Sequence, residues 1–96
     1  MADVKIKFES VERLWGDVFL MKDALSDALH GIAKIQNIVE FGALVGQAGD
    51  TLLANLNLQS EKTQTLIQKC EEIADDLQVI MDEFRDTESK SKSRFE

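Results

Sequence analysis

The sequence predicts an all-α fold, a two-helix antiparallel hairpin that pairs with further helices into a four-helix bundle. Two stretches of the chain have apolar residues at alternating steps of three and four, which places those residues on one side of an α-helix. Three of the five glycines fall between the two stretches, where they favour a bend. The 96 residues include no proline that would interrupt either stretch.

The first helix is predicted over residues 10–40, after a short arm at residues 1–9. Ser10 is a suitable N-cap, because its hydroxyl can accept a hydrogen bond from a backbone amide two or three residues further on. Beyond it, the alternating steps meet only apolar residues, and we expect this row to pack against another helix. The row consists of Val11, Leu14, Val18, Met21, Leu25, Ala28, Ile32, Ile35 and Val39.

The bend is predicted over residues 41–50, which contain Gly42, Gly46 and Gly49. A glycine inside a helix costs about 1 kcal/mol relative to alanine, so a continuous helix is unfavourable here. Asp50 or Thr51 then caps the second helix, where an acidic side chain is also favoured by the helix dipole.

The second helix is predicted over residues 51–88, followed by a flexible tail at residues 89–96, which is polar and low in complexity. Its apolar row is interrupted only by Gln59 and Thr63, which either fix the pairing register or face water near the bend; the second interpretation is preferred. Cys70 is expected in the core as a small hydrophobic residue. The row consists of Leu52, Leu56, Gln59, Thr63, Leu66, Cys70, Ile73, Leu77, Ile80 and Phe84.

A hairpin of this size is expected to need a partner. Two helices of such length leave no room for a third in the chain, and a lone hairpin buries only one side of each helix. Small domains that bury so little surface are marginally stable. The partner is either a second copy of the chain, giving a homodimer, or the helices of another protein.

The composition argues against several classes of function. A formal net charge of −7 disfavours nucleic acid and anionic membranes as partners. No apolar run approaches the roughly 20 residues that span a membrane, and the first ten residues lack the apolar core of a secretory signal peptide. We therefore expect no membrane insertion and a cytoplasmic location, or export together with a partner.

The sequence offers no catalytic, cofactor-binding or metal-binding constellation, and an enzyme is not expected. His30 falls opposite the apolar row of its helix and is expected in solvent. The acidic residues Glu71, Glu72, Asp75 and Asp76 take outward positions, where a solvated surface is a better interpretation than a cation site.

A second apolar group lies on the first helix. Trp15 flanks the predicted row, Phe19 follows one turn later, and Leu20 is its neighbour. The hypothesis is that these three residues form a partner-binding patch on the outer face of the helix. The alternative is ordinary scatter of apolar residues over the surface.

The chain resembles the WXG-type (early secreted antigen) superfamily of type VII secretion. It has about the right length, two long helices, a bend between them and a polar tail. Phe84 and Glu88 near the end of the second helix match the aromatic-x-x-x-acid export motif of that superfamily, with both side chains on one helix face. The bend contains Phe41 and glycines but no Trp-x-Gly motif, so the resemblance is greatest to the small accessory proteins encoded with LXG toxins in Gram-positive bacteria.

This resemblance implies a targeting factor that binds the N-terminal helical domain of a secreted toxin, alone or with a second small accessory protein. The factor presents Phe84 and Glu88 to the secretion ATPase. The residues expected to contact the toxin are Trp15, Phe19, Leu20, Leu66, Ile73, Leu77 and Ile80.

Two other functions remain as alternatives. A bacteriocin-immunity-type antitoxin is also small and helical, but such proteins usually form a self-contained bundle of three or four helices. A structural coiled-coil protein would also have the apolar rows, and it would need no export motif.

Overall fold

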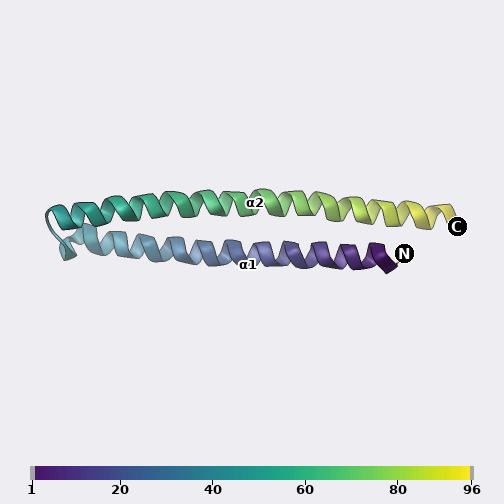
Figure 1. Cartoon of the computed structure of the whole chain (residues 1–96), viewed down its shortest axis with the longest axis horizontal. Helices are drawn as coiled ribbons and strands as arrows, with labels where there is room; N and C mark the ends of the chain where they lie inside the picture. Colours follow the sequence, from purple (N-terminus) through teal and green to yellow (C-terminus); the bar gives the residue numbers. More distant parts are fainter. Residues whose placement is uncertain (1, 96) are drawn as a thin grey trace.

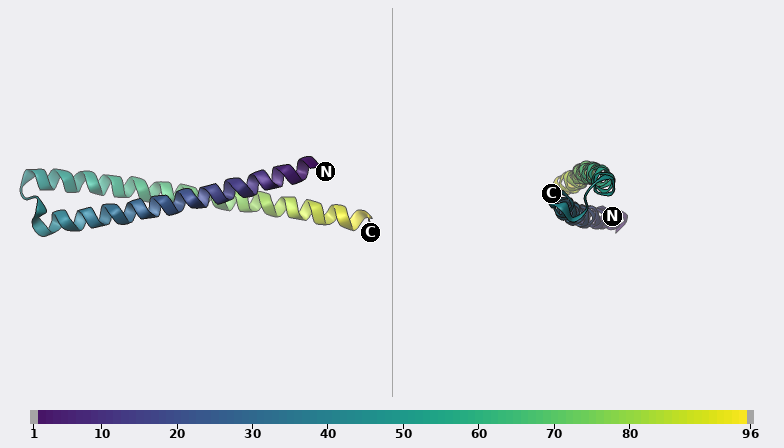
Figure 2. Two further views of the ribbon diagram at one scale, coloured as in Figure 1. Left: turned by 90° about the horizontal axis from the view of Figure 1, so that it is seen from below. Right: turned by 90° about the vertical axis from the view of Figure 1, so that its left-hand side faces the viewer.

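The computed structural model describes the backbone of residues 2–95 and the side chains of residues 7–42 and 44–87. It consists of α1 (Ala2–Ile38), a short π-helical turn η1 (Val39–Ala43) and α2 (Gln47–Phe95). The two helices lie antiparallel along their length and are joined at one end (Figure 1). A second view shows that they cross at a shallow angle (Figure 2). The prediction of an all-α, two-helix hairpin is confirmed.

The first helix starts earlier than predicted, at Ala2, so residues 2–9 are not an arm and Ser10 is not an N-cap. The reason is tertiary packing. Phe8 lies edge-on against Phe84 of α2, with ring centroids 6.2 Å apart, and the guanidinium of Arg85 lies 5.7 Å from the centre of the Phe8 ring. These contacts stabilise a helical segment in which only Val4 and Phe8 continue the helical spacing that leads to Val11.

The second helix is longer than predicted at both ends. It starts at Gln47, so Asp50 lies in its first turn rather than at its cap. In the first turn the carboxylate still interacts favourably with the helix dipole. The amide of Asp50 donates a hydrogen bond to the carbonyl of Gly46 over 3.1 Å. At the other end, the backbone remains helical through residues 89–95, which were predicted to form a flexible tail.

The chain reverses between Val39 and Gly46, a segment that overlaps the predicted range of 41–50 but starts and ends a few residues earlier. Gly42 and Gly46 both have positive φ angles, of 95° and 79°, which side-chain-bearing L-residues rarely adopt. Gly49 is required for a different reason, because a Cβ atom there would collide with the carbonyl oxygen of Leu44. The three glycines of the bend thus have specific structural roles.

Replacing Gly46 by alanine is expected to lower the free energy of unfolding by about 1–2 kcal/mol, because alanine is strained at this φ angle. Gly16→Ala is the matched control. Gly16 lies inside α1 with open space around its Cβ position, so alanine should stabilise the helix by about 0.5–1 kcal/mol. Urea unfolding followed by circular dichroism measures both. Equal effects of the two substitutions would contradict the assigned backbone conformation.

Each helix turns two neighbouring rows of residues toward the other helix. In the described part of the chain these rows repeat every seven residues and are buried or half-buried. In α1 the inward residues are Phe8, Val11, Trp15, Val18, Lys22, Leu25, Leu29, Ile32, Gln36 and Val39. In α2 they are Leu53, Leu56, Ser60, Thr63, Ile67, Cys70, Ala74, Leu77, Met81 and Phe84. Cys70 lies in the best-buried cluster, with Val18, Ala74 and Leu77, as expected.

Only about half of the residues in the two predicted apolar rows face the other helix. The residues at every seventh position from Val11 and from Leu56 do face inward. The residues between them do not: Leu14, Met21, Ala28 and Ile35 of α1, and Gln59, Leu66, Ile73 and Ile80 of α2, are exposed. Both helices have an apolar stripe three rows wide, and a single neighbouring helix covers only two of those rows.

The polar stretch of α2 near the bend forms a continuous helix. The hydroxyls of Thr63 and Thr65 donate to the backbone carbonyls of Gln59 and Glu61, four residues earlier, over 2.7 and 3.0 Å. The side-chain amide of Gln36 donates to Asn57 across the hairpin over 2.8 Å. Gln59 is exposed, in agreement with the preferred interpretation, whereas Thr63 is half-buried between the helices.

Candidate functional site

The uncovered third row of each helix is the candidate functional site. In α1 it consists of Leu14, Met21, Ala28 and Ile35, and in α2 of Leu66, Ile73 and Ile80. These seven residues are called the apolar face below. The large side chains among them are between 39% and 58% exposed, so they lie on the surface of the hairpin rather than between its two helices.

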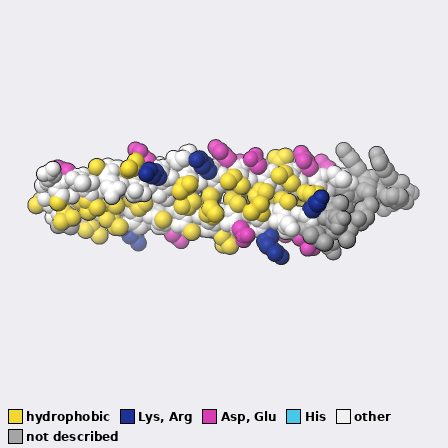
Figure 3. Space-filling view, in the orientation of Figure 1, with side chains coloured by type: hydrophobic (Ala, Val, Ile, Leu, Met, Phe, Trp, Pro, Cys, Tyr) yellow, Lys and Arg dark blue, Asp and Glu magenta, His cyan; other side chains and the backbone are white. Residues whose placement is uncertain are grey.

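Both rows lie on the same side of the hairpin. Two antiparallel helices that bury the same heptad positions are related by an approximate two-fold axis perpendicular to their common plane. Such a rotation keeps equivalent rows on one side of that plane. The space-filling view shows the result, with hydrophobic side chains running along the molecule over both helices and charged side chains at the edges (Figure 3).

On the opposite side of the hairpin α2 is polar, whereas α1 has Phe19 and Ala33 there together with Glu12, Ser26 and Glu40. On α2 this side is lined by Asn57, Gln64, Glu71, Gln78 and Arg85, all polar or charged. There the ammonium of Lys22 lies 3.3 Å from a carboxylate oxygen of Glu71, in an ion pair that joins the two helices. The hairpin is therefore amphipathic across its thickness, in addition to the amphipathicity of each helix.

The predicted patch of Trp15, Phe19 and Leu20 is not a single surface. Trp15 is half-buried and packs against the core cluster, and Phe19 stacks on it with ring centroids 4.5 Å apart. Lys22 also lies 5.7 Å from the centre of the Phe19 ring. Leu20, 68% exposed, points away because each residue turns the helix by about 100°. The hypothesis that the three residues form one contiguous patch is therefore wrong.

The other expected contact residues divide into two groups. Leu66, Ile73 and Ile80 belong to the apolar face and are available to a partner. Leu77 is only 7% exposed and belongs to the core between the two helices, so its placement in a partner contact was wrong. Sequence reasoning missed the contribution of Leu14, Met21 and Ile35 to the same face, because it placed them in the buried row.

The two residues of the predicted export motif lie near the open end of the hairpin. Phe84 is half-buried and closes the core there by packing on Phe8. The side chain of Glu88 lies outside the described residues. The backbone at residue 88 is helical, and residues 84 and 88 are four apart, so both positions lie on one face of α2.

The described residues contain no group of three or more histidine, cysteine or acidic side chains arranged to hold a metal ion. His30 is exposed, and so are Glu71, Glu72, Asp75 and Asp76. Among the described residues, no helix has an apolar segment sufficient to cross a membrane.

The molecule exposes far more surface than a compact domain of its mass. Its accessible surface is 7,513 Å², against roughly 5,500 Å² for a folded monomer of 10.8 kDa. The radius of gyration is 21.5 Å, against about 12.5 Å for a compact domain of this length. This difference reflects a rod of 75 × 16 × 15 Å with an open apolar side.

Comparison with known proteins gave no match: no protein-family model, curated protein or solved structure is significantly similar to this chain.

Proposed function

We propose that the protein is a non-enzymatic binding module, an accessory targeting protein of a bacterial type VII secretion system. Its partner is the N-terminal helical domain of an LXG-type toxin, which covers the apolar face and completes a four-helix bundle. A second small accessory protein is a further candidate member of the complex. The complex forms in the cytoplasm and is delivered to the secretion ATPase, with or without export of this protein itself.

The observation that carries this proposal is the apolar face. Three exposed apolar side chains follow one another at seven-residue steps on α2, beside four on α1. Amphipathic helices recognise such rows through apolar anchors at the same spacing. An exposed apolar surface of this extent, bordered by charged residues, is typical of a protein interaction site.

The other candidate functions are less well supported. An immunity-type antitoxin would need a self-contained helical bundle, whereas this hairpin has one uncovered side. A structural coiled-coil protein would use the same side for self-association alone. Co-purification with the toxin's helical domain, produced together with this protein, tests the proposal directly. A stable stoichiometric complex supports it, and absence of any complex with such a domain would overturn it.

Phe84→Ala and Glu88→Ala are each expected to abolish export of the toxin while the complex still forms, because the motif acts on the secretion machinery after binding. Secretion of the toxin into the culture medium measures the first effect, and co-purification measures the second.

The matched control for Phe84→Ala is Phe8→Ala. It removes the same aromatic contact, worth about 0.5–1.5 kcal/mol, but leaves the motif intact. Export should therefore persist with Phe8→Ala. If Phe8→Ala and Phe84→Ala reduce export equally, the effect comes from loss of packing and the motif assignment is wrong.

A further inference from the structure

The charges beside the apolar face have an ordered pattern on α2. Lys62, Lys69, Asp76 and Glu83 follow one another at seven-residue steps, so they form one line along the outer edge of the apolar row. All four side chains are exposed. From the bend outward the line has two positive charges and then two negative charges. Such a line is complementary to a copy of itself that runs in the opposite direction.

We propose that, when no other partner is bound, a second copy of this chain covers the apolar face, with the bends of the two hairpins at opposite ends. In this homodimer α1 lies over α1 and α2 lies over α2 of the second copy, both antiparallel, around a two-fold axis parallel to the apolar face. The inference does not depend on the proposed secretion function, because it uses only residues of this chain.

The charges on α2 fix the register of this pairing. Lys69 meets Asp76 of the second copy when the two-fold axis passes midway between those positions. In the same register Lys62 meets Glu83, which gives four ion pairs per dimer. The apolar row then fits: Ile73 meets its own copy and Leu66 meets Ile80. The polar positions Gln59 and Thr87, which continue this row, also face each other.

The contacts within the hairpin show that α1 fits the same axis. Lys22 lies level with Glu71, and Gln36 lies level with Asn57, so residue 21 of α1 is level with residue 72 of α2. The axis near Ile73 therefore passes within about one residue, or 1.5 Å, of Met21. Met21 then meets its own copy, and Leu14 meets Ala28. The two-fold axis fixed by the charges of α2 therefore also pairs the apolar residues of α1.

The opposite orientation, with both bends at the same end, is less favourable. It places α1 over α2 of the second copy, and the apolar residues still match, with Met21 over Ile73. The edge of α2 then runs beside the corresponding edge of α1, where Asp17 is the only charged residue among the side chains that the structure describes. Asp17 lies level with Asp76, which gives repulsion instead of four attractive pairs. Charge, rather than apolar contact, decides the orientation.

The available area is sufficient for such a dimer. A stable interface removes about 800 Å² from each partner. The rod exposes roughly 2,000 Å² more than a compact monomer of its mass would expose. Covering one side of the rod is thus consistent with a stable interface, and the ion pairs contribute specificity at its edge.

Charge reversal tests the proposal. Sedimentation equilibrium of the purified chain should give a dimer at micromolar concentration. Lys62→Glu with Lys69→Glu should raise the dissociation constant at least about tenfold, since it turns all four pairs repulsive. Asp76→Lys with Glu83→Lys should do the same. Mixing the two variants should restore the dimer, because all four pairs then have opposite charges again.

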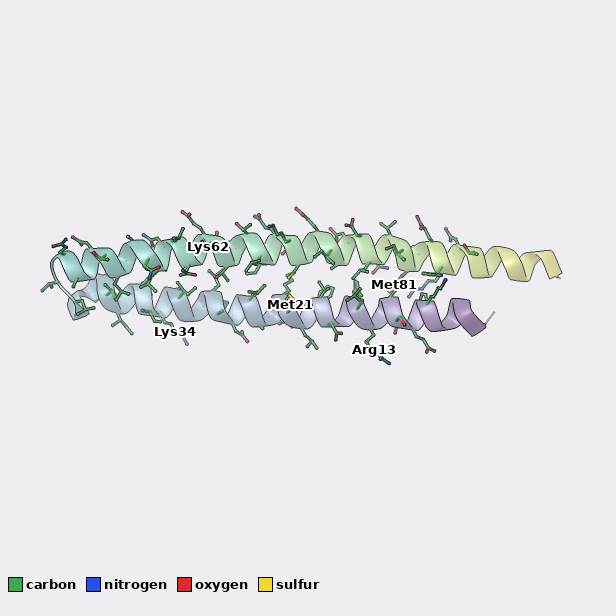
Figure 4. All side chains as sticks on the ribbon, viewed as in Figure 1. Arg13, Met21, Lys34, Lys62 and Met81 are labelled. Atoms are coloured by element: carbon green, nitrogen blue, oxygen red, sulfur yellow. The ribbon has the colours of Figure 1, made fainter. Side chains whose placement is uncertain are left out.

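The matched control is Arg13→Glu with Lys34→Glu, which changes the net charge equally. These two residues lie along the outer edge of α1, away from α2, whereas Lys62 borders the apolar face (Figure 4). The control should dimerise like the unmodified chain. A monomeric unmodified chain, or charge-reversed variants that dimerise as tightly as the control, would overturn the proposal.

Cysteine cross-linking tests the orientation separately, in a chain in which Cys70 is replaced by alanine. Ile73→Cys alone should form a disulfide-linked dimer, because position 73 lies near its own copy at the two-fold axis. If cross-linking instead requires a mixture of Met21→Cys and Ile73→Cys chains, the bends lie at the same end and the proposed arrangement is wrong.

Discussion

Replacing Leu66 and Ile73 by aspartate is expected to weaken partner binding about 100-fold or more while leaving helical content unchanged. In the free hairpin both positions are 48% exposed, so the new carboxylates remain hydrated. In a complex they would be buried without a partner charge, which costs several kcal/mol. Calorimetry with the toxin's helical domain measures the affinity, and circular dichroism measures the helical content.

The control for this experiment is Leu58→Asp with Val79→Asp. These residues have similar exposure, 47% and 56%, but lie on the outer side of α2, away from both α1 and the apolar face. Both variants exchange two aliphatic residues for aspartate and change the net charge equally, so the main difference is position. Partner binding should be retained in the control. Equal loss of binding in both variants would show that the apolar face has no special role.

Leu77→Ala is expected to lower the free energy of unfolding by about 2–5 kcal/mol, the usual range for removing a buried leucine side chain. Leu77 lies in the best-buried cluster of the hairpin, and the described residues form no second such cluster that could compensate for its loss. Urea unfolding of dilute protein, followed by circular dichroism, gives the free energy directly. The loss should be independent of protein concentration.

Ile73→Ala is the comparison that makes this result specific. Ile73 is half-exposed in the hairpin, and alanine is the better helix former, so the dilute protein should lose less than about 1 kcal/mol. Sequence periodicity alone treats Leu77 and Ile73 as equivalent members of one apolar row. If both substitutions destabilise the dilute protein equally, the two rows are assigned incorrectly.

The sequence predicted the hairpin and the location of its bend because those features depend on local properties. Apolar residues at steps of three and four require a helix, and three closely spaced glycines disfavour one. The ends of the helices could not be predicted in the same way. Residues 2–9 continue the helical spacing only through Val4 and Phe8. Phe8 packs on Phe84, a residue far away in the sequence, and the local sequence does not reveal this contact.

The candidate site was predicted in part. Leu66, Ile73 and Ile80 were expected to contact a partner and do lie on the exposed apolar face. Leu77 was assigned to the same group but is buried within the hairpin, and Trp15 is held by the core and by Phe19. The missing information was the rotation of each helix about its own axis.

The sequence by itself determined that two long amphipathic helices fold back on each other and that each has an apolar stripe. Only the tertiary structure decided which part of each stripe is buried. A stripe three rows wide can meet a neighbouring helix through either pair of adjacent rows, and the two choices differ by a rotation of the helix. In the structure the pair with Val18, Cys70, Ala74 and Leu77 at its centre is the core, and the remaining row is the apolar face.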